Sequence, residues 1–211
     1  MPRAAGYNPR VPIHATGVIL AGGKSRRLGA EKPLQVVGGA SLIERVVDAL
    51  SPCVDQLLLV TNRPELYSFL GLETIPDIHP GRGPLAGMQA AFRHIGSPSA
   101  LVVAGDYPFL TPTALKRILR EDPAGGVVLP QIGGQRHPLC AHYASSSATQ
   151  IEEALAAGEL MVLSFVARLR QVVLDEREFG GESAARVFFN VNTPEDLRHA
   201  EGLLGQAQPR R

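Results

Sequence analysis

The chain is poor in several features that mark common classes of protein. Its two cysteines, Cys53 and Cys140, lie far apart in apolar contexts and lack the spacing of metal ligands. A disulfide framework is therefore not expected, and we predict two free thiols in a reducing compartment. No run of about 18 apolar residues is present, which excludes a membrane span. Residues 1–12 hold no apolar core of a secretory signal, so the expected location is the cytoplasm.

An excess of either charge is also lacking. Lysine and arginine number 21 and aspartate and glutamate number 20, which leaves a formal net charge of +1 at pH 7. Proteins that bind nucleic acid usually carry a basic field, so we expect no nucleic-acid partner. Recognition of an anion must then come from local groups, and lysine is scarce: its three positions are Lys24, Lys32 and Lys116.

Length and composition are those of one globular domain. The 211 residues, 45% hydrophobic and 19% charged, suit one domain better than two. Neither internal repeats nor a linker interrupt the chain. We predict a single domain over residues 16–205, a disordered lead-in over residues 1–15 and a polar tail over residues 206–211, and we expect a monomer.

Strands and helices alternate through the first half of the chain. Continuous apolar runs indicate strands covered on both faces, and the helices between them have one apolar face or a capping residue. The predicted strands are residues 18–21, 56–61, 72–75 and 100–104, and the predicted helices are residues 41–50, 85–95 and a segment from 111 onward. This alternation predicts an α/β fold, a single Rossmann-like three-layer α/β/α domain with a mostly parallel sheet.

The second half is less regular and is predicted to be partly antiparallel. A turn at residues 133–136 separates two apolar runs, as in a pair of neighbouring antiparallel strands. The predicted strands are residues 126–130, 138–143 and 171–174, and the predicted helices are residues 145–157 and 161–169. Residues 188–196 are expected to pass from a strand through a loop into a capped helix.

The most informative stretch is residues 17–32. Its apolar residues 18–21 form a predicted strand, which breaks at Gly22-Gly23 into a loop that carries Arg27 and Lys32 among other cations. Glycine lets backbone N–H groups approach an anion, and the cations neutralise its charge. The stretch therefore predicts a phosphate site, with Arg27 and Lys32 as ligands of a triphosphate and of the pyrophosphate that leaves it.

Two familiar phosphate loops are excluded. The P-loop has four residues between its first glycine and Gly-Lys-Ser, whereas five separate Gly17 from Gly23 here, and Gly17 precedes the strand. The dinucleotide fingerprint G-x-G-x-x-G is absent as well.

Polar residues follow the predicted strands, and in a parallel sheet these strand ends meet at one edge. They are Gly22, Lys32, Asn62, Asp77, Asp106, Asn190 and Asn192. Asp106, between an apolar strand and Pro108, is the candidate ligand of Mg²⁺, which prefers one or two carboxylates together with phosphate oxygens and water. A turn or capping role remains the alternative for Asp106. Asn190 and Asn192 either add oxygen ligands, with a second metal left open, or form the turn before Thr193.

Five motifs in this order resemble one known family. The opening pattern L-A-G-G-x-S-x-R-x-G-x-(D/E)-K resembles the signature of nucleotidylyltransferases, and its Ala-Gly-Gly form is most similar to molybdenum cofactor guanylyltransferases. The other four motifs are G-P-L-A-G (83–87), D-Y-P-F (106–109), R-H-P (136–138) and F-x-N-x-N-T-P-E-D (188–196). Leu28 stands where methionine is usual and Glu31 where aspartate is usual, and neither departure changes a charge.

The resemblance implies an activity and a set of contacts. The activity is transfer of GMP from GTP to the terminal phosphate of molybdopterin, which releases pyrophosphate. The implied catalytic residues are Arg27, Lys32 and Asp106, with Mg²⁺ on Asp106. The implied GTP contacts are Leu20, Ala21, Gly22, Lys32, Asn62, Asp77 and Asp106. Proteins that deliver or accept the pterin cofactor are further expected partners. A cytidylyltransferase on the same pterin and a non-catalytic nucleotide-binding regulator are the alternatives.

Three finer expectations concern single residues. The Asp77 carboxylate, an acceptor only, can take the N1–H and amino groups of guanine, or it can bind ribose. The segment Arg136-His137-Pro138 is placed near the second substrate. Lys32→Ala is expected to leave the stability of the apo protein nearly unchanged, because surface charges contribute little to folding.

Overall fold

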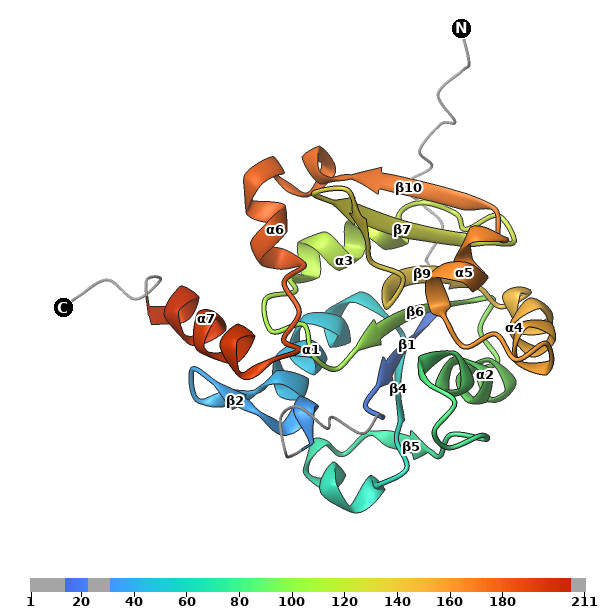
Figure 1. Cartoon of the computed structure of the whole chain (residues 1–211), viewed down its shortest axis with the longest axis horizontal. Coiled ribbons are helices and arrows are strands. Elements are labelled where there is room, and N and C mark those ends of the chain that lie inside the picture. Colours follow the sequence, from blue (N-terminus) through green and yellow to red (C-terminus); the bar gives the residue numbers. More distant parts are fainter. Residues whose placement is uncertain (1–13, 23–30, 206–211) are drawn as a thin grey trace, which may run out of the picture.

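The computed structural model describes residues 14–22 and 31–205 (Figure 1). The strands are β1 (Ala15–Leu20), β2 (Val36–Val37), β3 (Ala40–Ser41), β4 (Gln56–Val60), β5 (Glu73–Ile75), β6 (Ser99–Ala104), β7 (Val127–Ile132), β8 (Gln135–Arg136), β9 (Cys140–Ala144) and β10 (Gln171–Asp175). The α-helices are α1 (Leu42–Leu50), α2 (Pro84–His94), α3 (Pro112–Leu119), α4 (Ser147–Ala156), α5 (Val162–Ala167), α6 (Ala184–Val187) and α7 (Pro194–Gly205). Most of the predicted lead-in and all of the tail lie outside the described residues.

One large sheet runs through the molecule in the order β10-β7-β9-β6-β1-β4-β5, with β8 paired to β7. Strand β1 is parallel to both β4 and β6, and β4 is parallel to β5. Strand β9 lies antiparallel between β6 and β7, and β10 is parallel to β7. The mostly parallel sheet and its partly antiparallel second half are therefore confirmed.

Two hydrophobic clusters cover the two faces of this sheet. Successive residues of a strand point to opposite faces, so Ile19 packs with α1 and α3 while Val18 and Leu20 pack with α2, α4 and α5. The layers of helix, sheet and helix confirm the predicted three-layer architecture. In the part of the chain that the structure describes, no helix is long and apolar enough to cross a membrane.

Two helices begin at the caps that the sequence predicts. Before α1, the Ser41 hydroxyl accepts from the Glu44 N–H at 3.4 Å, and the Ser41 N–H donates to Glu44 Oε2 at 2.7 Å. This capping box gives hydrogen-bond acceptors to the N–H of the cap residue Ser41 and to the N–H of Glu44 in the first turn of the helix. Before α3, Thr111 Oγ1 accepts from the Ala114 N–H at 3.2 Å, and Pro112 occupies the first turn.

The strand predicted at residue 188 is wrong. The short helix α6 ends at Val187, and the next residues run outside the sheet, where the Val191 N–H donates to the Asp106 carbonyl at 2.9 Å. Both neighbours of β6 are already taken, by β1 and β9, so no sheet position is open beside it. Phe188 and Val191 are buried in side-chain clusters instead of a strand ladder.

A buried histidine on β9 makes stability depend on pH. His142 is 2% exposed, its Nδ1 contacts the Glu121 carbonyl at 3.2 Å, and its Nε2 has no partner among the described residues. Burial lowers the pKa of His142 to about 4 from 6.5. As the pH falls, the unfolded chain therefore takes up this proton before the folded protein does. The contribution of His142 to the free energy of unfolding is complete above pH 6.5 and is lost as the pH falls toward 4.

We expect the free energy of unfolding to fall by about 2 kcal/mol between pH 7.5 and 5 because of His142 alone. Urea unfolding at the two pH values measures the change. His142→Gln, which cannot titrate, should show a correspondingly weaker pH dependence. An equal dependence in both proteins would mean that His142 is not the responsible group.

Candidate active site

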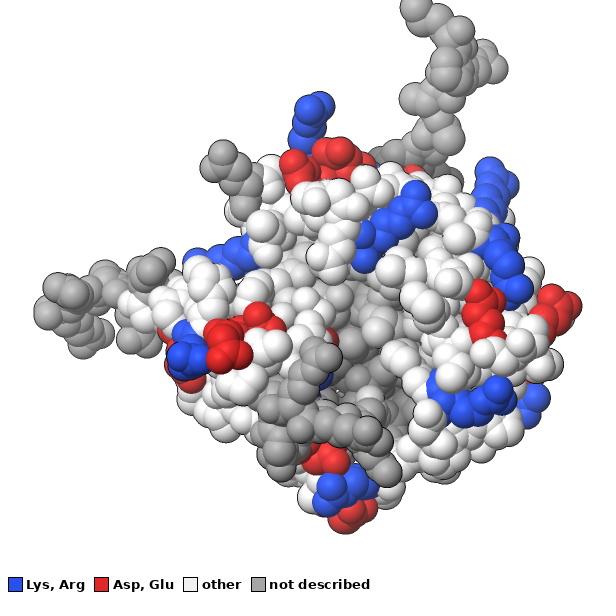
Figure 2. Space-filling model, viewed as in Figure 1, with Lys and Arg blue, Asp and Glu red and all other residues white. Residues whose placement is uncertain are grey.

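The carboxyl ends of β1, β4, β5 and β6 form one edge of the sheet, and backbone hydrogen bonds hold their loops together there. The Ala21 N–H donates to the Val60 carbonyl at 3.0 Å, and the Gly105 N–H donates to the Leu20 carbonyl at 3.1 Å. The space-filling view shows a hollow near the middle of the face of the molecule that is drawn. The hollow lies between the side formed by β2 and α7 and the side formed by α2 and α5 (Figure 2). Ligands of open α/β sheets bind at such an edge.

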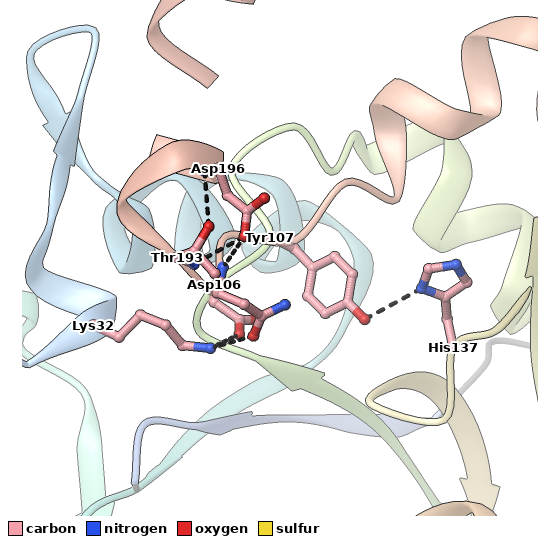
Figure 3. A network of polar contacts seen from close by, with 7 residues as sticks. Lys32, Asp106, Tyr107, His137, Thr193 and Asp196 are labelled. Carbon is pink, nitrogen blue, oxygen red and sulfur yellow. Dashed lines mark hydrogen bonds and ion pairs between the residues drawn. The ribbon is translucent and has the colours of Figure 1, made fainter. Parts of the chain in front are cut away.

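Three predicted residues meet at this edge. Lys32 Nζ donates to Asp106 Oδ2 and, at 2.9 Å, to Asn192 Oδ1 (Figure 3). The partners are 74 and 160 residues away from Lys32 in the sequence. The lysine begins a short 3₁₀ helix, Lys32–Leu34, whose Pro33 packs so close to Gly105 that a Cβ there would lie 3.2 Å from the Pro33 Cβ. Glycine at position 105 therefore permits the close approach of the two loops.

Asp106 is a carboxylate held away from water. Its residue is 7% exposed, and Oδ1 is buried with no hydrogen-bond partner in residues 14–22 and 31–205. Burial raises the pKa of Asp106, and the positive charge of Lys32 and its hydrogen bond act in the opposite direction. A buried oxygen without a donor is a position that a bound cation can satisfy.

The chemistry of the ligand set fits Mg²⁺ better than a metal held by protein alone. The described residues include no group of three or more His, Cys, Asp or Glu side chains that could hold a metal ion. Mg²⁺ needs few protein ligands, because it keeps several waters and binds substrate phosphates beside one or two carboxylates. Asp106 is the carboxylate that this arrangement offers.

Asn192 is positioned by the start of α7. Asp196 Oδ2 accepts from the N–H groups of Asn192 and Thr193, each at 2.8 Å, and Thr193 Oγ1 accepts from the Asp196 N–H at 3.1 Å. Burial acts to raise the pKa of Asp196, but these hydrogen bonds bring it below its usual value. The cap turns the Asn192 side chain toward Lys32. In the described part of the chain, the Asn190 side chain makes no hydrogen bond.

Asn62 and Asp77 lie together after β4 and β5. Asn62 Oδ1 accepts from the Asp77 N–H at 3.0 Å, and Asp77 Oδ1 accepts from the His79 N–H at 2.9 Å. The Asn62 carbonyl oxygen therefore holds the loop that carries Asp77. The Asn62 amide group and the second carboxylate oxygen of Asp77 are the atoms these contacts leave for a ligand.

The glycine turn after β1 is only partly described. Leu20 and Ala21 are buried, so their side chains face the core, whereas Gly22 is exposed, and apart from its neighbours in the chain no atom of the described residues lies within 4 Å of the position that a Cβ would take there. Arg27 lies outside the described residues. Leu20 and Ala21 could therefore reach a ligand through backbone atoms only.

Two sequence motifs have structural roles that the sequence does not reveal. Gly87 in α2 faces Leu20 and Val60, where a Cβ would lie 3.4 and 3.5 Å from their side chains, so it lets the helix pack on the sheet. His137 is buried, and its Nδ1 lies 3.3 Å from the Tyr107 hydroxyl (Figure 3). Tyr107 follows Asp106 directly, yet Figure 3 shows its ring turned from Lys32 toward His137.

The fold and the site together define an open α/β protein with a buried carboxylate and a lysine at the carboxyl edge of its sheet, where proteins of this architecture bind their ligands. Comparison with known proteins gives the particular family. The family model for the MobA-like NTP transferase domain matches residues 17–173. The chain therefore belongs to this family, as the motifs indicate, and the predicted resemblance is confirmed.

Curated relatives carry a consistent name. The chain is 37% identical over 186 residues to a probable molybdenum cofactor guanylyltransferase of Pelotomaculum thermopropionicum. The matched residues cover 88% of this chain and 91% of the relative. The chain is also 37% identical over 213 residues to the molybdenum cofactor guanylyltransferase of Rhizobium meliloti, with 94% and 97% covered. Molybdopterin-guanine dinucleotide biosynthesis protein A of Archaeoglobus fulgidus has a similar structure, with a TM-score of 0.76, 34% identity, and 90% and 99% covered.

Proposed function

We propose that the protein transfers GMP from GTP to the terminal phosphate of molybdopterin, giving the guanine dinucleotide form of the cofactor and pyrophosphate. The observation that carries this proposal is the meeting of Lys32, Asp106 and Asn192 at the carboxyl edge of the sheet. The relatives named above support guanine as the base and molybdopterin as the acceptor.

The reaction needs little from a general base. The second pKa of a phosphate monoester is about 6, so the molybdopterin phosphate is mostly a dianion at pH 7 and a competent nucleophile. Its oxygen bonds to the α-phosphorus of GTP in line as the bond to the bridging oxygen of the β-phosphate breaks. The described residues at the Lys32 cluster include no histidine–carboxylate pair, which is consistent with catalysis by positioning and charge neutralisation.

We assign roles to the chain's own residues on this basis. Lys32, with Arg27 as a second cation, binds the triphosphate and the charge that develops on pyrophosphate. Asp106 would hold Mg²⁺, which when bound supplies positive charge to the phosphate oxygens. The proposed GTP contacts remain Leu20, Ala21, Gly22, Lys32, Asn62, Asp77 and Asp106.

GTP is expected to raise the melting temperature more than CTP or ATP at equal concentration, and more with Mg²⁺ than without it. A ligand at 100 times its dissociation constant stabilises by about 2.7 kcal/mol, which corresponds to roughly 5–10 °C for a chain of this size. Thermal unfolding followed by fluorescence of an external dye measures these shifts.

Equal shifts for GTP and CTP would contradict the choice of guanine and favour the cytidylyl alternative. A second assay, pyrophosphate release from GTP in the presence of molybdopterin, separates a transferase from a nucleotide-binding regulator. Binding of GTP without release of pyrophosphate would favour the regulator.

A further inference from the structure

The loop after β4 contacts the segment of Lys32 as well as that of Asp77. Its Asn62 holds the Asp77 backbone, as described above. Its next residue, Arg63, donates from Nη1 to Glu31 Oε1 at 2.8 Å, and Glu31 directly precedes Lys32. The consecutive residues Asn62 and Arg63 thus contact the segments that carry Asp77 and Lys32, the two groups that we place on the nucleotide.

The backbone of Arg63 is itself well anchored. Its N–H donates to Thr61 Oγ1 at 3.2 Å, and its carbonyl accepts from the Leu66 N–H at 3.1 Å. The following turn buries Tyr67, which is 1% exposed and belongs to the hydrophobic core. Burial and the neighbouring Glu31 carboxylate raise the pKa of the Tyr67 hydroxyl. Arg63 therefore extends toward Glu31 from a backbone position that two hydrogen bonds hold.

The contact with Arg63 bears directly on the turn that presents Lys32. The Glu31 carbonyl accepts from the Leu34 N–H at 3.1 Å, and the Lys32 carbonyl accepts from the Gln35 N–H at 3.1 Å. These two bonds define the 3₁₀ turn Lys32–Leu34. A displacement of Glu31 would therefore move the first residue of this turn, which is Lys32.

We propose that Arg63 is a positioning residue that, through Glu31, holds Lys32 at the place where it meets Asp106 and the nucleotide phosphates. The inference rests on the proposed function of this site. The Arg63 side chain is 55% exposed, and exposed ion pairs contribute little to folding. A small misplacement of a catalytic group, in contrast, can slow a reaction by up to about a hundredfold. Loss of the pair should therefore affect the reaction much more than stability.

Four variants test this inference. Arg63→Met removes the charge but keeps the aliphatic chain, Glu31→Gln removes the partner charge, and Arg63→Lys keeps a cation at the same position. Glu65→Gln is the matched control, because Glu65 lies 3.6 Å from Arg63 Nε but is not attached to the lysine turn. Amide hydrogen exchange of Leu34 and Gln35 reports on the turn, and kcat/KM for GTP reports on the reaction.

Arg63→Met and Glu31→Gln should each speed exchange at Leu34 and Gln35 by about tenfold. Both should lower kcat/KM by roughly ten- to a hundredfold, with the melting temperature of the apo protein nearly unchanged. Arg63→Lys should keep most of the wild-type rate, and Glu65→Gln should behave as wild type in both measurements.

Unchanged exchange in Arg63→Met would overturn the inference whatever the activity. Faster exchange with an unchanged kcat/KM would overturn it too, as would a loss of rate that merely follows a large loss of stability. A wild-type protein that releases no pyrophosphate from GTP would instead contradict the proposed function, and hydrogen exchange would still decide whether Arg63 holds the turn.

Discussion

Asp106→Asn is expected to slow guanylyl transfer by roughly a hundred- to a thousandfold while the protein still folds. Asparagine keeps the size of the side chain and an oxygen that can accept from Lys32, but it removes the anionic ligand that Mg²⁺ requires. The charge of the phosphates then goes unbalanced in the transition state. One preorganised electrostatic group contributes about 3–4 kcal/mol to such a state, which corresponds to the expected loss of rate.

The same substitution should leave the apo protein as stable as wild type or make it more stable. Burial raises the pKa of Asp106, which means that the ionised carboxylate is costly to keep at this place. Transfer rates across a Mg²⁺ titration and urea unfolding of the apo protein measure the two effects. Asp48→Asn, at an exposed carboxylate on α1, is the control. Normal rates with normal dependence on Mg²⁺ would contradict the proposal that Asp106 holds Mg²⁺.

Lys32→Ala is expected to reduce turnover by about a hundredfold, since the phosphates lose a cation held in place by two oxygen partners. The structure also changes the expected stability of the Lys32→Ala variant. Lys32 is not a free surface charge, because its side chain is 23% exposed and pairs with the buried Asp106. Removal leaves that carboxylate without the cation, and a broken buried pair typically costs 3–5 kcal/mol. Because the pair is partly exposed, about 2 kcal/mol is the expected loss at pH 7.

The loss of stability in Lys32→Ala should diminish in acid. Without the lysine, the folded-state pKa of Asp106 lies further above its unfolded value, so the folded protein takes up the proton first. The stability contributed by this group is then full at low pH and is lost as the pH rises through the folded pKa. Urea unfolding between pH 5 and 8 measures this trend.

The double variant Lys32→Ala with Asp106→Asn separates the two roles of the lysine. It should recover the stability lost in Lys32→Ala, because no unpaired carboxylate remains, but it should not recover turnover. If Lys32→Ala alone were as stable as wild type at every pH, the ion pair would contribute nothing to folding and the original expectation from the sequence would hold.

Local features of the chain were predictable because they depend on residues a few positions apart. The Ser41–Glu44 capping box and the Thr111-Pro112 helix start involve side chains and N–H groups within one helical turn. The apolar runs of β1, β4 and β6 reflect burial on both faces of a sheet. The edge at which Lys32, Asn62, Asp77 and Asp106 gather follows from the general geometry of parallel sheets.

Other features depend on which segments become neighbours. The strand predicted at residue 188 failed because β1 and β9 occupy both sides of β6, and an apolar run by itself does not show whether a sheet position is free. His137 turned out to contact Tyr107 within the core, and Gly87 proved to serve the packing of α2 against β1 and β4. Neither role has a signal in the local pattern of residues.

The sequence by itself determined the α/β class, the order of the strands and helices along the chain except at residue 188, and a set of polar residues at one edge of the sheet. The tertiary structure decided how those residues meet: Lys32 with Asp106 and Asn192, Asn62 with Asp77, and Arg63 with Glu31. The physical reason is that propensity, capping and hydrophobic pattern act over a few residues. Hydrogen bonds between groups 15 to 160 positions apart, in contrast, depend on the packing of the whole domain.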